Sequence, residues 1–228
     1  MKSIIAYSGG LDSTVLAYDT VDSEGADSVE LAHVDLGTKT SKVAIEAMKF
    51  HAERLGVRWT VIPMQLPSVV TEGCRIFDKK GDRKKRAVDS LGDEGLAQKQ
   101  DTLWDDYAPG LYTIIWIVLG ALAVRRGCSR VLTGFQQHNP DGEVIVSRSD
   151  TLLDCCAYFT DYLNAERQAI WGRGAPMFLA PLNELTKEDV VALGRHHDVD
   201  MSMTHSCDIY PACGVCYECR AREAALDG

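Results

Sequence analysis

The segment SIIAYSGGLDST, at residues 3–14, constrains the fold most strongly, because a short β-prone run leads directly into two glycines and several hydroxyl side chains. A strand that ends in Ser8-Gly9-Gly10 and turns into a helix exposes backbone N–H groups with little side-chain obstruction. The two glycines can adopt positive φ angles, and the N-terminus of a helix favours negative charge. The segment therefore predicts an anion-binding loop between a strand and a helix.

The side chains of this loop indicate which anion it binds. Ser8, Ser13 and Thr14 add hydroxyl donors, whereas the carboxylate of Asp12 would repel a phosphate unless a Mg²⁺ ion lay between them. The loop has neither the Gly-Lys-Ser/Thr of a Walker A motif nor the G-x-G-x-x-G of a dinucleotide fingerprint. An ordinary turn with a serine N-cap would need only one glycine and one hydroxyl, so we favour a phosphate site.

Further β-prone runs alternate with helical segments along the chain. Apolar runs follow the first one at residues 28–36, 58–64, 129–135 and 175–182. Between the first two of these, apolar residues recur at helical spacing and stop at Gly56. This alternation predicts an α/β fold with an open parallel sheet, helices on both faces and ligands at the edge where the strands end.

Composition argues against several classes of protein. The 228 residues are 46% hydrophobic, enough for a core, and their formal net charge of −9 argues against a broad contact with nucleic-acid phosphates. The basic run at residues 79–86 is more typical of a solvated loop than of an RNA-binding patch. The most apolar stretch, residues 111–124, is too short to span a bilayer and predicts a buried helix. Because the N-terminus does not resemble a signal peptide, we expect a cytoplasmic protein with no membrane and no stable nucleic-acid partner; a homodimer stays open.

Four of the eight cysteines cluster near the C-terminus. Cys207, Cys213, Cys216 and Cys219 fall within thirteen residues, and Gly214 permits a tight turn between them. Four thiolates at this spacing can close a tetrahedral Zn²⁺ site, and an iron–sulfur cluster is the main alternative because it also takes four cysteines. Disulfides are disfavoured in the cytoplasm. We predict a structural zinc ion that fastens the tail.

The organisation of the chain follows from these features. Residues 66–106 are polar and charged and interrupt the alternation of strands and helices, so they predict an insertion or loop. We divide the chain into a nucleotide-binding α/β domain at residues 1–200 and a zinc-binding segment at residues 201–228.

The loop and the tail resemble those of known families. SGGLDS at residues 8–13 is similar to the pyrophosphate-binding motif of the PP-loop ATP pyrophosphatases, and the tail resembles that of the 7-cyano-7-deazaguanine synthase family. The tail residues that carry the resemblance are Pro181, Leu182, Lys187, Thr204, Ser206, the four clustered cysteines and either Arg222 or Arg220. The weaker matches are Asp35 in VDLG, Pro109-Gly110 and Thr133-Gly134.

The resemblance implies an enzyme of queuosine-type 7-deazapurine biosynthesis. Such an enzyme converts 7-carboxy-7-deazaguanine, ammonia and two ATP into the nitrile 7-cyano-7-deazaguanine (preQ0), through adenylated acid and amide intermediates. Asp12, as the holder of Mg²⁺, and Lys187, as a phosphate contact, would be the catalytic residues. The residues implied in ATP binding are Ser8, Gly9, Gly10, Leu11, Asp12, Ser13, Thr14, Asp35 and Gly134. Without the resemblance, Lys187 is equally well a surface lysine, and Asp35 a helix or turn cap.

Two segments depart from the family pattern. The family has Pro-Gly-Arg-Asn where this chain continues Pro109-Gly110 with Leu111-Tyr112. Where the family has Gly-Tyr-Pro-Asp-Cys-Arg, the segment LLDCCAYF of this chain keeps only Asp154 and Cys155 in place and has Cys156 at the position of the arginine. We therefore expect these segments to set substrate choice. The expected substrate-binding residues are Tyr112 and Phe159, with Tyr158 as a further candidate, as stacking surfaces for a base, and Asp154, as a polar contact. The alternative is that the aromatic rings pack in the core and that Asp154 caps a helix.

Other functions remain open at this point. A PP-loop ligase could adenylate a related carboxylate once and stop at the amide. A tRNA-modifying PP-loop enzyme is disfavoured by the net charge. A binding protein without turnover is disfavoured by the intact loop, since a retired site need not keep Asp12.

Overall fold

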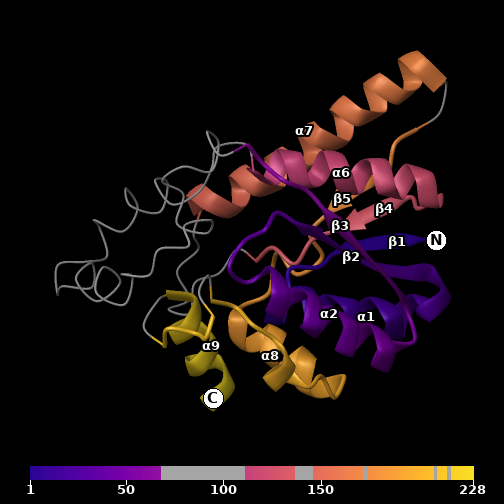
Figure 1. Ribbon diagram of the computed structural model, residues 1–228. Coiled ribbons are helices and arrows are strands. Elements are labelled where there is room, and N and C mark those ends of the chain that lie inside the picture. Colours follow the sequence, from indigo (N-terminus) through magenta and orange to yellow (C-terminus); the bar gives the residue numbers. More distant parts are fainter. Residues whose placement is uncertain (68–110, 137–145, 172–173, 208–209, 215–216) are drawn as a thin grey trace.

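A computed structural model describes the chain at residues 1–67, 111–136, 146–171, 174–207, 210–214 and 217–228. At its centre lies a five-stranded sheet (Figure 1). Its strands are β1 (Ser3–Ala6), β2 (Val29–Asp35), β3 (Arg58–Pro63), β4 (Arg130–Leu132) and β5 (Met177–Leu179), in the spatial order β3-β2-β1-β4-β5. Every pair of neighbours is parallel, which confirms the predicted sheet.

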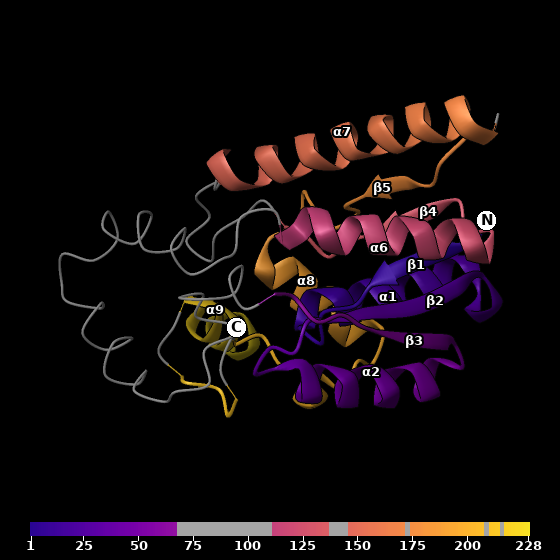
Figure 2. The ribbon, with the colours of Figure 1, turned by 45° about the horizontal axis from the view of Figure 1, so that its top comes forward.

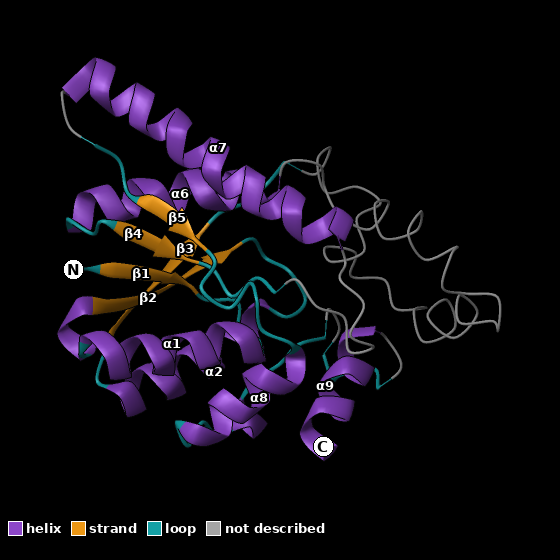
Figure 3. Ribbon diagram, turned by 180° about the vertical axis from the view of Figure 1, so that it is seen from behind, coloured by secondary structure: helices purple, strands orange, loops and turns teal. Residues whose placement is uncertain are grey.

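Helices cover both faces of this sheet, as the sequence predicts. The helices are α1 (Leu11–Glu24), α2 (Ser41–Leu55), α6 (Leu111–Arg126), α7 (Val146–Trp171), α8 (Lys187–His196) and α9 (Tyr217–Asp227), with short 3₁₀ turns η1 (Ala26–Ser28) and η2 (Met201–Met203). Figure 3 shows α1 and α2 against one face and α6 and α7 against the other, with α8 and α9 beyond α1 and α2. Helix α9 contacts α8, and its Ala225 belongs to the core cluster beneath α1.

Strand β1 shows how one strand serves two cores. Ile5 packs with Leu31 and Met48 in the cluster beneath α1 and α2, whereas Ile4 packs with Trp116 in the cluster beneath α6 and α7. Both isoleucines are fully buried. Because successive side chains of a strand point to opposite faces, a strand covered on both sides is a continuous apolar run in the sequence.

Helix α2 ends at the residue that the sequence predicts. Gly56 follows its last residue with a φ of 66°, a left-handed conformation that suits glycine, and its N–H donates to the carbonyls of Ala52 and Glu53. The chain then turns into the edge strand β3.

Helix α6 differs from the expected buried helix because the described residues cover only part of its surface. Trp116, Leu119 and Ala123 are buried against the sheet, whereas Ile117 is 49% exposed and Val124 is 39% exposed. The helix forms the outer layer on its face, so its apolar residues on the far side remain open in the described structure. No described helix is long and apolar enough to cross a membrane.

The strand order places a switch point between β1 and β4. Helices α1 and α2 carry the chain from β1 outward to β3 on one face, and α6 returns it to the other side of β1 on the opposite face (Figure 2). In open α/β sheets such a reversal leaves a crevice beyond the carboxyl ends of the strands, where ligands bind. The loop at residues 8–14 leaves β1 there, and Thr133-Gly134 leaves β4 there. From residue 68 on, the expected insertion lies outside the described residues, as do Pro109, Gly110 and Cys216.

Candidate functional site

The loop after β1 runs so close to α2 that a side chain does not fit at Gly9. The φ angle of Gly9 is 82°, and a Cβ atom on this residue would lie 2.5 Å from the Cα atom of Ala44. Gly10 differs from the expectation that both glycines adopt positive φ, since its φ is −80° and it forms the N-cap of α1. No side chain caps this helix end, so the serine cap of an ordinary turn is absent. The N-terminus of α1 is thereby left open to an anion.

The hydroxyl groups of the loop have separate roles. Ser8 is exposed, while Ser13 and Thr14 are buried. The Thr14 hydroxyl donates to the carbonyl of Gly10 at 2.8 Å and lies 2.8 Å from the hydroxyl of Tyr7, so it locks the loop and is not presented to a ligand as expected. The Ser13 hydroxyl accepts from the Ser8 N–H at 3.2 Å and lies 3.0 Å from the Ser8 hydroxyl. Only Ser8 offers an accessible hydroxyl.

The side chain of Leu11 is fully buried in the core, so only the backbone of this residue can contact a nucleotide. Gly134 also belongs to the loop through its backbone. A Cβ atom at Gly134 would lie 2.9 Å from the nitrogen of Ser13 and 3.0 Å from the carbonyl carbon of Asp12. Glycine therefore allows the end of β4 to touch the first turn of α1, which places the two predicted segments in one site.

Asp12 and Lys187 meet at this site, although the chain separates them widely. The Lys187 Nζ lies 2.6 Å and 2.7 Å from the two carboxylate oxygens of Asp12. Lys187 is only 7% exposed, so it is not a surface lysine. A cation in the first turn of a helix is opposed by the helix dipole, and a buried ammonium needs a charged partner. The position of Lys187 works against local helix preference, which is typical of a functional group.

The turn before α8 holds Lys187 in place. Thr186 caps the helix in a reciprocal pair with Asp189, in which the Thr186 Oγ1 accepts from the Asp189 N–H at 3.1 Å and the Asp189 carboxylate accepts from the Thr186 N–H at 3.0 Å. Gln136, soon after β4, donates from Nε2 to the Thr186 carbonyl at 3.2 Å. Our reading of the sequence missed Gln136; the only signal was its position just beyond the end of a predicted strand.

The C-terminal segment closes the loop from the other side. The N–H of His205 donates to the carbonyl of Gly9 at 2.8 Å. The Arg222 guanidinium donates to the Thr204 hydroxyl at 2.6 Å, and Arg220 is exposed, so Arg222 is the arginine that joins the site. Burial lowers the pKa of Arg222, and the charges of Asp12 and Cys219 act in the opposite direction.

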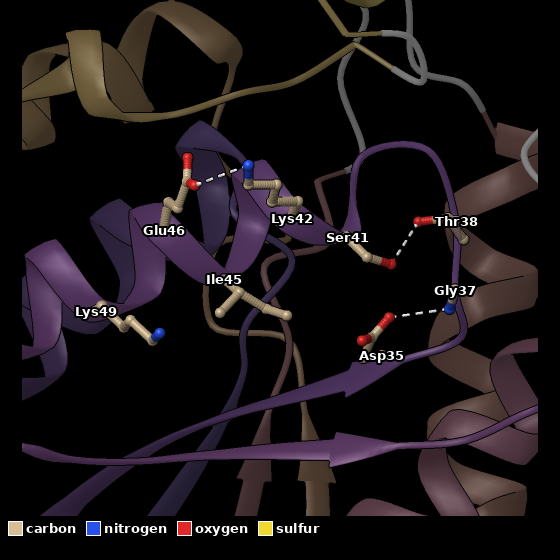
Figure 4. Close-up of a pocket in the computed structure, with 8 residues that line it drawn as sticks. All are labelled: Asp35, Gly37, Thr38, Ser41, Lys42, Ile45, Glu46 and Lys49. Carbon is tan, nitrogen blue, oxygen red and sulfur yellow. Dashed lines mark hydrogen bonds and ion pairs between the residues drawn. The ribbon is translucent and has the colours of Figure 1, made fainter.

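Asp35 lies at the end of β2, the neighbour of strand β1, which leads into the loop at residues 8–14. Its Oδ1 accepts a hydrogen bond from the N–H of Gly37 at 2.9 Å, so it does cap a turn. Its carboxylate also lines an open pocket of about 410 Å³ between this turn and α2 (Figure 4). The other residues that line the pocket are Gly37, Thr38, Ser41, Lys42, Ile45, Glu46 and Lys49.

Three of the four predicted metal ligands converge. The Sγ atoms of Cys207 and Cys213 are 3.7 Å apart, those of Cys213 and Cys219 are 3.9 Å apart, and all three lie within 4.8 Å of one another. Gly214 has a φ of 73°, as expected for the tight turn between ligands. These cysteines can hold a metal ion; the fourth predicted ligand, Cys216, lies outside the described residues.

The predicted substrate-binding residues are dispersed. Tyr112 is 39% exposed, and its ring centroid lies 5.7 Å from that of Phe135, the residue after Gly134. Phe159 is buried, and its ring packs on Trp116 and Phe178, which is the core-packing alternative. Our reading of the sequence missed Phe135, the last residue of a predicted strand, whose ring packs on Tyr112 directly after the glycine that touches the first turn of α1.

The neighbouring segment of α7 gives less support to a substrate site. Asp154 is exposed and lies inside α7, so it does not cap the helix. Cys156, which stands where the family has an arginine, is buried, and burial raises the pKa of its thiol to about 11. This thiol therefore stays protonated and packs as an apolar group.

Comparison with known proteins identifies the family. The family model described as "QueC: Queuosine biosynthesis protein QueC" matches residues 2–228. A 7-cyano-7-deazaguanine synthase of Koribacter versatilis is 26% identical over 229 residues, which cover 100% of this chain and 89% of the relative. One from Porphyromonas gingivalis is 27% identical over 229 residues, covering 98% of this chain and 91% of the relative. The chain belongs to the QueC family.

A solved structure shares the fold. The U34-tRNA thiolase NcsA from Methanococcus maripaludis, solved with its [4Fe-4S] cluster, matches with a TM-score of 0.51 at 16% identity, over 100% of this chain and 64% of that chain. At this identity the likeness concerns the fold alone, and it agrees with the predicted open α/β architecture.

Proposed function

We propose that this member of the QueC family is a 7-cyano-7-deazaguanine synthase, an ATP-dependent ligase that turns 7-carboxy-7-deazaguanine and ammonia into the nitrile preQ0. The observation that carries the proposal is the meeting of Asp12 and Lys187 at the open N-terminus of α1. A helix N-terminus, a buried ammonium and a carboxylate able to hold a metal ion are suited to bind and neutralise a departing pyrophosphate.

The first half of the reaction activates an unreactive group. A carboxylate oxygen attacks the α-phosphorus of ATP, the bond to the β-phosphate oxygen breaks, and pyrophosphate leaves. Ammonia then attacks the acyl carbon, loses a proton and expels AMP, which gives the amide. The second half repeats the activation at the amide oxygen. Loss of AMP and of the remaining N–H protons then forms the nitrile, so two ATP yield two AMP and two pyrophosphates.

The residues of the loop would stabilise the pyrophosphate. The exposed Ser8 hydroxyl and the backbone N–H groups at the start of α1 would donate to its oxygens, and the Lys187 ammonium would balance its charge. Asp12 would keep Lys187 over the helix N-terminus and use its remaining lone pairs for Mg²⁺. A bound Mg²⁺ ion would add positive charge next to the phosphates. Asp35 and the backbone at Gly134 border the same edge of the sheet, and we keep them in the proposed nucleotide site.

The cysteine cluster fits zinc better than a four-iron cluster. A tetrahedral Zn²⁺ ion with bonds of about 2.3 Å to sulfur places its sulfurs about 3.8 Å apart. The separations of 3.7 Å and 3.9 Å match this value. In a four-iron cluster each thiolate binds a different iron, which spreads the sulfurs farther apart. Zinc would hold the tail in its folded form, and free thiols suit the expected cytoplasmic setting.

The acceptor would bind where Tyr112 and Phe135 border the loop. Tyr112 is half-exposed and rests on Phe135, so its ring is available to a flat heterocycle. Phe159 would not contact the acceptor; it would support the site indirectly, because its ring packs on Trp116. The position of Asp154 gives no support to direct contact with the base.

The test is product analysis with purified, zinc-loaded protein. Incubation with ATP, Mg²⁺, ammonium and 7-carboxy-7-deazaguanine should give preQ0, AMP and pyrophosphate, measured by mass spectrometry. Amide as the only product would establish the ligase that adenylates once and would contradict the nitrile. AMP formation that does not depend on 7-carboxy-7-deazaguanine, but requires another acid, would overturn the assigned substrate.

A further inference from the structure

One short segment of the chain contacts the loop at residues 8–14, here called the phosphate loop, and leads directly into the cysteine cluster formed by Cys207, Cys213 and Cys219. We call residues 204–206 the bridge. The N–H of His205 donates to the carbonyl of Gly9 at 2.8 Å, and the next residue after the bridge is the predicted metal ligand Cys207. Gly9 is packed so closely against Ala44 of α2 that a Cβ atom would not fit. A shift of the bridge would therefore act on a part of the loop that has little freedom to adjust.

Arg222 fastens the bridge from α9. Its Nη1 donates to the hydroxyl of Thr204 at 2.6 Å and lies 3.4 Å from the hydroxyl of Ser206, while its Nη2 donates to the carbonyl of Met201 at 2.5 Å. Thr204 is buried, and its hydroxyl donates to the same Met201 carbonyl at 2.8 Å. The planar guanidinium thus joins both sides of the turn that leads into the bridge, which a single ammonium group cannot do.

The same arginine lies near both sites. The Ser206 hydroxyl that it contacts is 3.9 Å from the position where a Cβ atom of Gly10 would stand. Arg222 follows Cys219 by three residues on α9, so the two side chains share a face of the helix. The charges of Asp12 and of Cys219 both act on the guanidinium. One side chain therefore contacts the bridge, faces the loop and shares a helix face with a metal ligand.

We infer that Arg222 is a positioning residue that couples the metal at the cysteine cluster to nucleotide binding at the phosphate loop. Metal binding would fix Cys207 and Cys219, and Arg222 would pass that constraint through the bridge to Gly9. Coupling of this kind is reciprocal, so bound nucleotide would also tighten the hold on the metal. The inference rests on the proposed function for the identity of the nucleotide as ATP.

The first test measures nucleotide affinity without turnover. The Kd of a non-hydrolysable ATP analogue, with Mg²⁺ present, is measured by calorimetry on the zinc-loaded full chain and on three variants. Arg222→Gln should raise the Kd roughly 10-fold, a typical size for such coupling. Arg222→Lys, which keeps the charge but loses the fork, should fall between Arg222→Gln and the unaltered chain. Arg220→Gln, an equal loss of charge on the exposed side of the same helix, should leave the Kd unchanged.

The second test needs no substitution and so does not depend on a variant that folds. Zinc release to a chelator is timed in the unaltered chain with and without the ATP analogue. We expect the analogue to slow release roughly 10-fold, and to have no effect on release from Arg222→Gln.

The outcomes separate the inference from the proposed function. If the unaltered chain binds the analogue but zinc release is the same with and without it, the coupling is wrong and the proposed function stands. An unchanged Kd in Arg222→Gln would overturn the inference in the same way. If the unaltered chain does not bind the analogue at all, the proposed function and the inference both fail.

Discussion

The phosphate loop after β1 and the aromatic surface formed by Tyr112 and Phe135 lie at the same edge of the sheet, yet they are held in place differently. The loop is fixed by contacts with a definite geometry, from Ala44 against Gly9 to the ion pair of Asp12 and Lys187. The aromatic surface is a half-exposed ring that rests on its neighbours. Rigidity in the proposed phosphate site suits chemistry that requires alignment, whereas a flat apolar surface, as proposed for the acceptor, suits acceptors of related shape.

The largest expected effect is at the ion pair. Asp12→Asn removes the charge that pairs with Lys187 and the proposed ligand of Mg²⁺, and leaves a buried ammonium without its carboxylate. We expect the rate of AMP formation to fall by roughly 10²–10³-fold, as for other groups that stabilise developing charge. Asp22→Asn, a neutralisation at an exposed position on the same helix, is the matched control. An unchanged rate in Asp12→Asn would mean that the acid has no part in the chemistry.

The next largest effect is expected where the loop approaches α2. Substitutions at two glycines can separate the effect of this contact from that of backbone strain. Gly9 and Gly25 both have a φ of 82°, but a Cβ atom at Gly25 would meet nothing within 4 Å. Gly25→Ala should therefore cost only the backbone strain, about 1–2 kcal/mol of unfolding free energy. Gly9→Ala adds the clash with Ala44 and should cost about 1–3 kcal/mol more. Chemical denaturation of both variants measures the difference, and equal losses would show that the contact with α2 yields easily.

These contacts show which parts of the site could be predicted from the sequence. The loop could be predicted because its glycines, hydroxyls and acid lie together in seven residues. The separate roles of its hydroxyl groups could not be predicted. Thr14 is buried, and its hydroxyl is hydrogen-bonded to the carbonyl of Gly10 and to the hydroxyl of Tyr7, an arrangement that depends on the folded loop. A role for Lys187 could be predicted only through the family resemblance, because its burial against Asp12 depends on the fold.

The sequence could not predict which of two similar residues faces the site when this depends on the orientation of a helix. Arg220 and Arg222 have similar local sequence, and only the rotation of α9 decides that Arg222 meets Thr204. Phe159 and Tyr112 are both aromatic residues in segments that depart from the family, and packing alone makes the first a core residue and the second half-exposed. The fold was easier to predict, because strands buried on both faces leave apolar runs in the sequence.

Acid should weaken the layer of α1 and α2 that supports the phosphate loop. His51 is fully buried, with its Nδ1 atom 3.0 Å from the hydroxyl of Tyr18, and burial lowers its pKa to about 4. Burial also lowers the pKa of His33, on the same side of the sheet. Between a pH of about 6.5, the pKa of an unfolded histidine, and pH 4, the unfolded chain binds more protons than the folded one. The unfolding free energy should therefore be full above this window and fall as the pH decreases through it.

For His51 alone the loss between pH 6.5 and 5 should be on the order of 2 kcal/mol. Chemical denaturation across this range measures it, and His51→Gln, which cannot titrate, should flatten the slope. Hydrogen exchange should show α1 and α2 losing protection before α6. A stability that stays constant from pH 6.5 to 5 would contradict the assignment of a neutral buried His51.

The smallest expected effect concerns the aromatic surface, and it tests whether acceptor binding and phosphate binding are separate. Tyr112→Ala removes a ring that is already 39% exposed, so the fold should lose little, while the KM for 7-carboxy-7-deazaguanine should rise roughly 5- to 10-fold, the worth of one stacking contact. The KM for ATP should stay the same, because the ring of Tyr112 packs on Phe135 and Trp116, which lie outside the proposed phosphate site. Tyr158→Ala, at a residue 73% exposed on α7, is the comparison. A rise in KM for the acceptor in Tyr158→Ala but not in Tyr112→Ala would place the acceptor on α7, and a rise in KM for ATP in Tyr112→Ala would show that one surface serves both substrates.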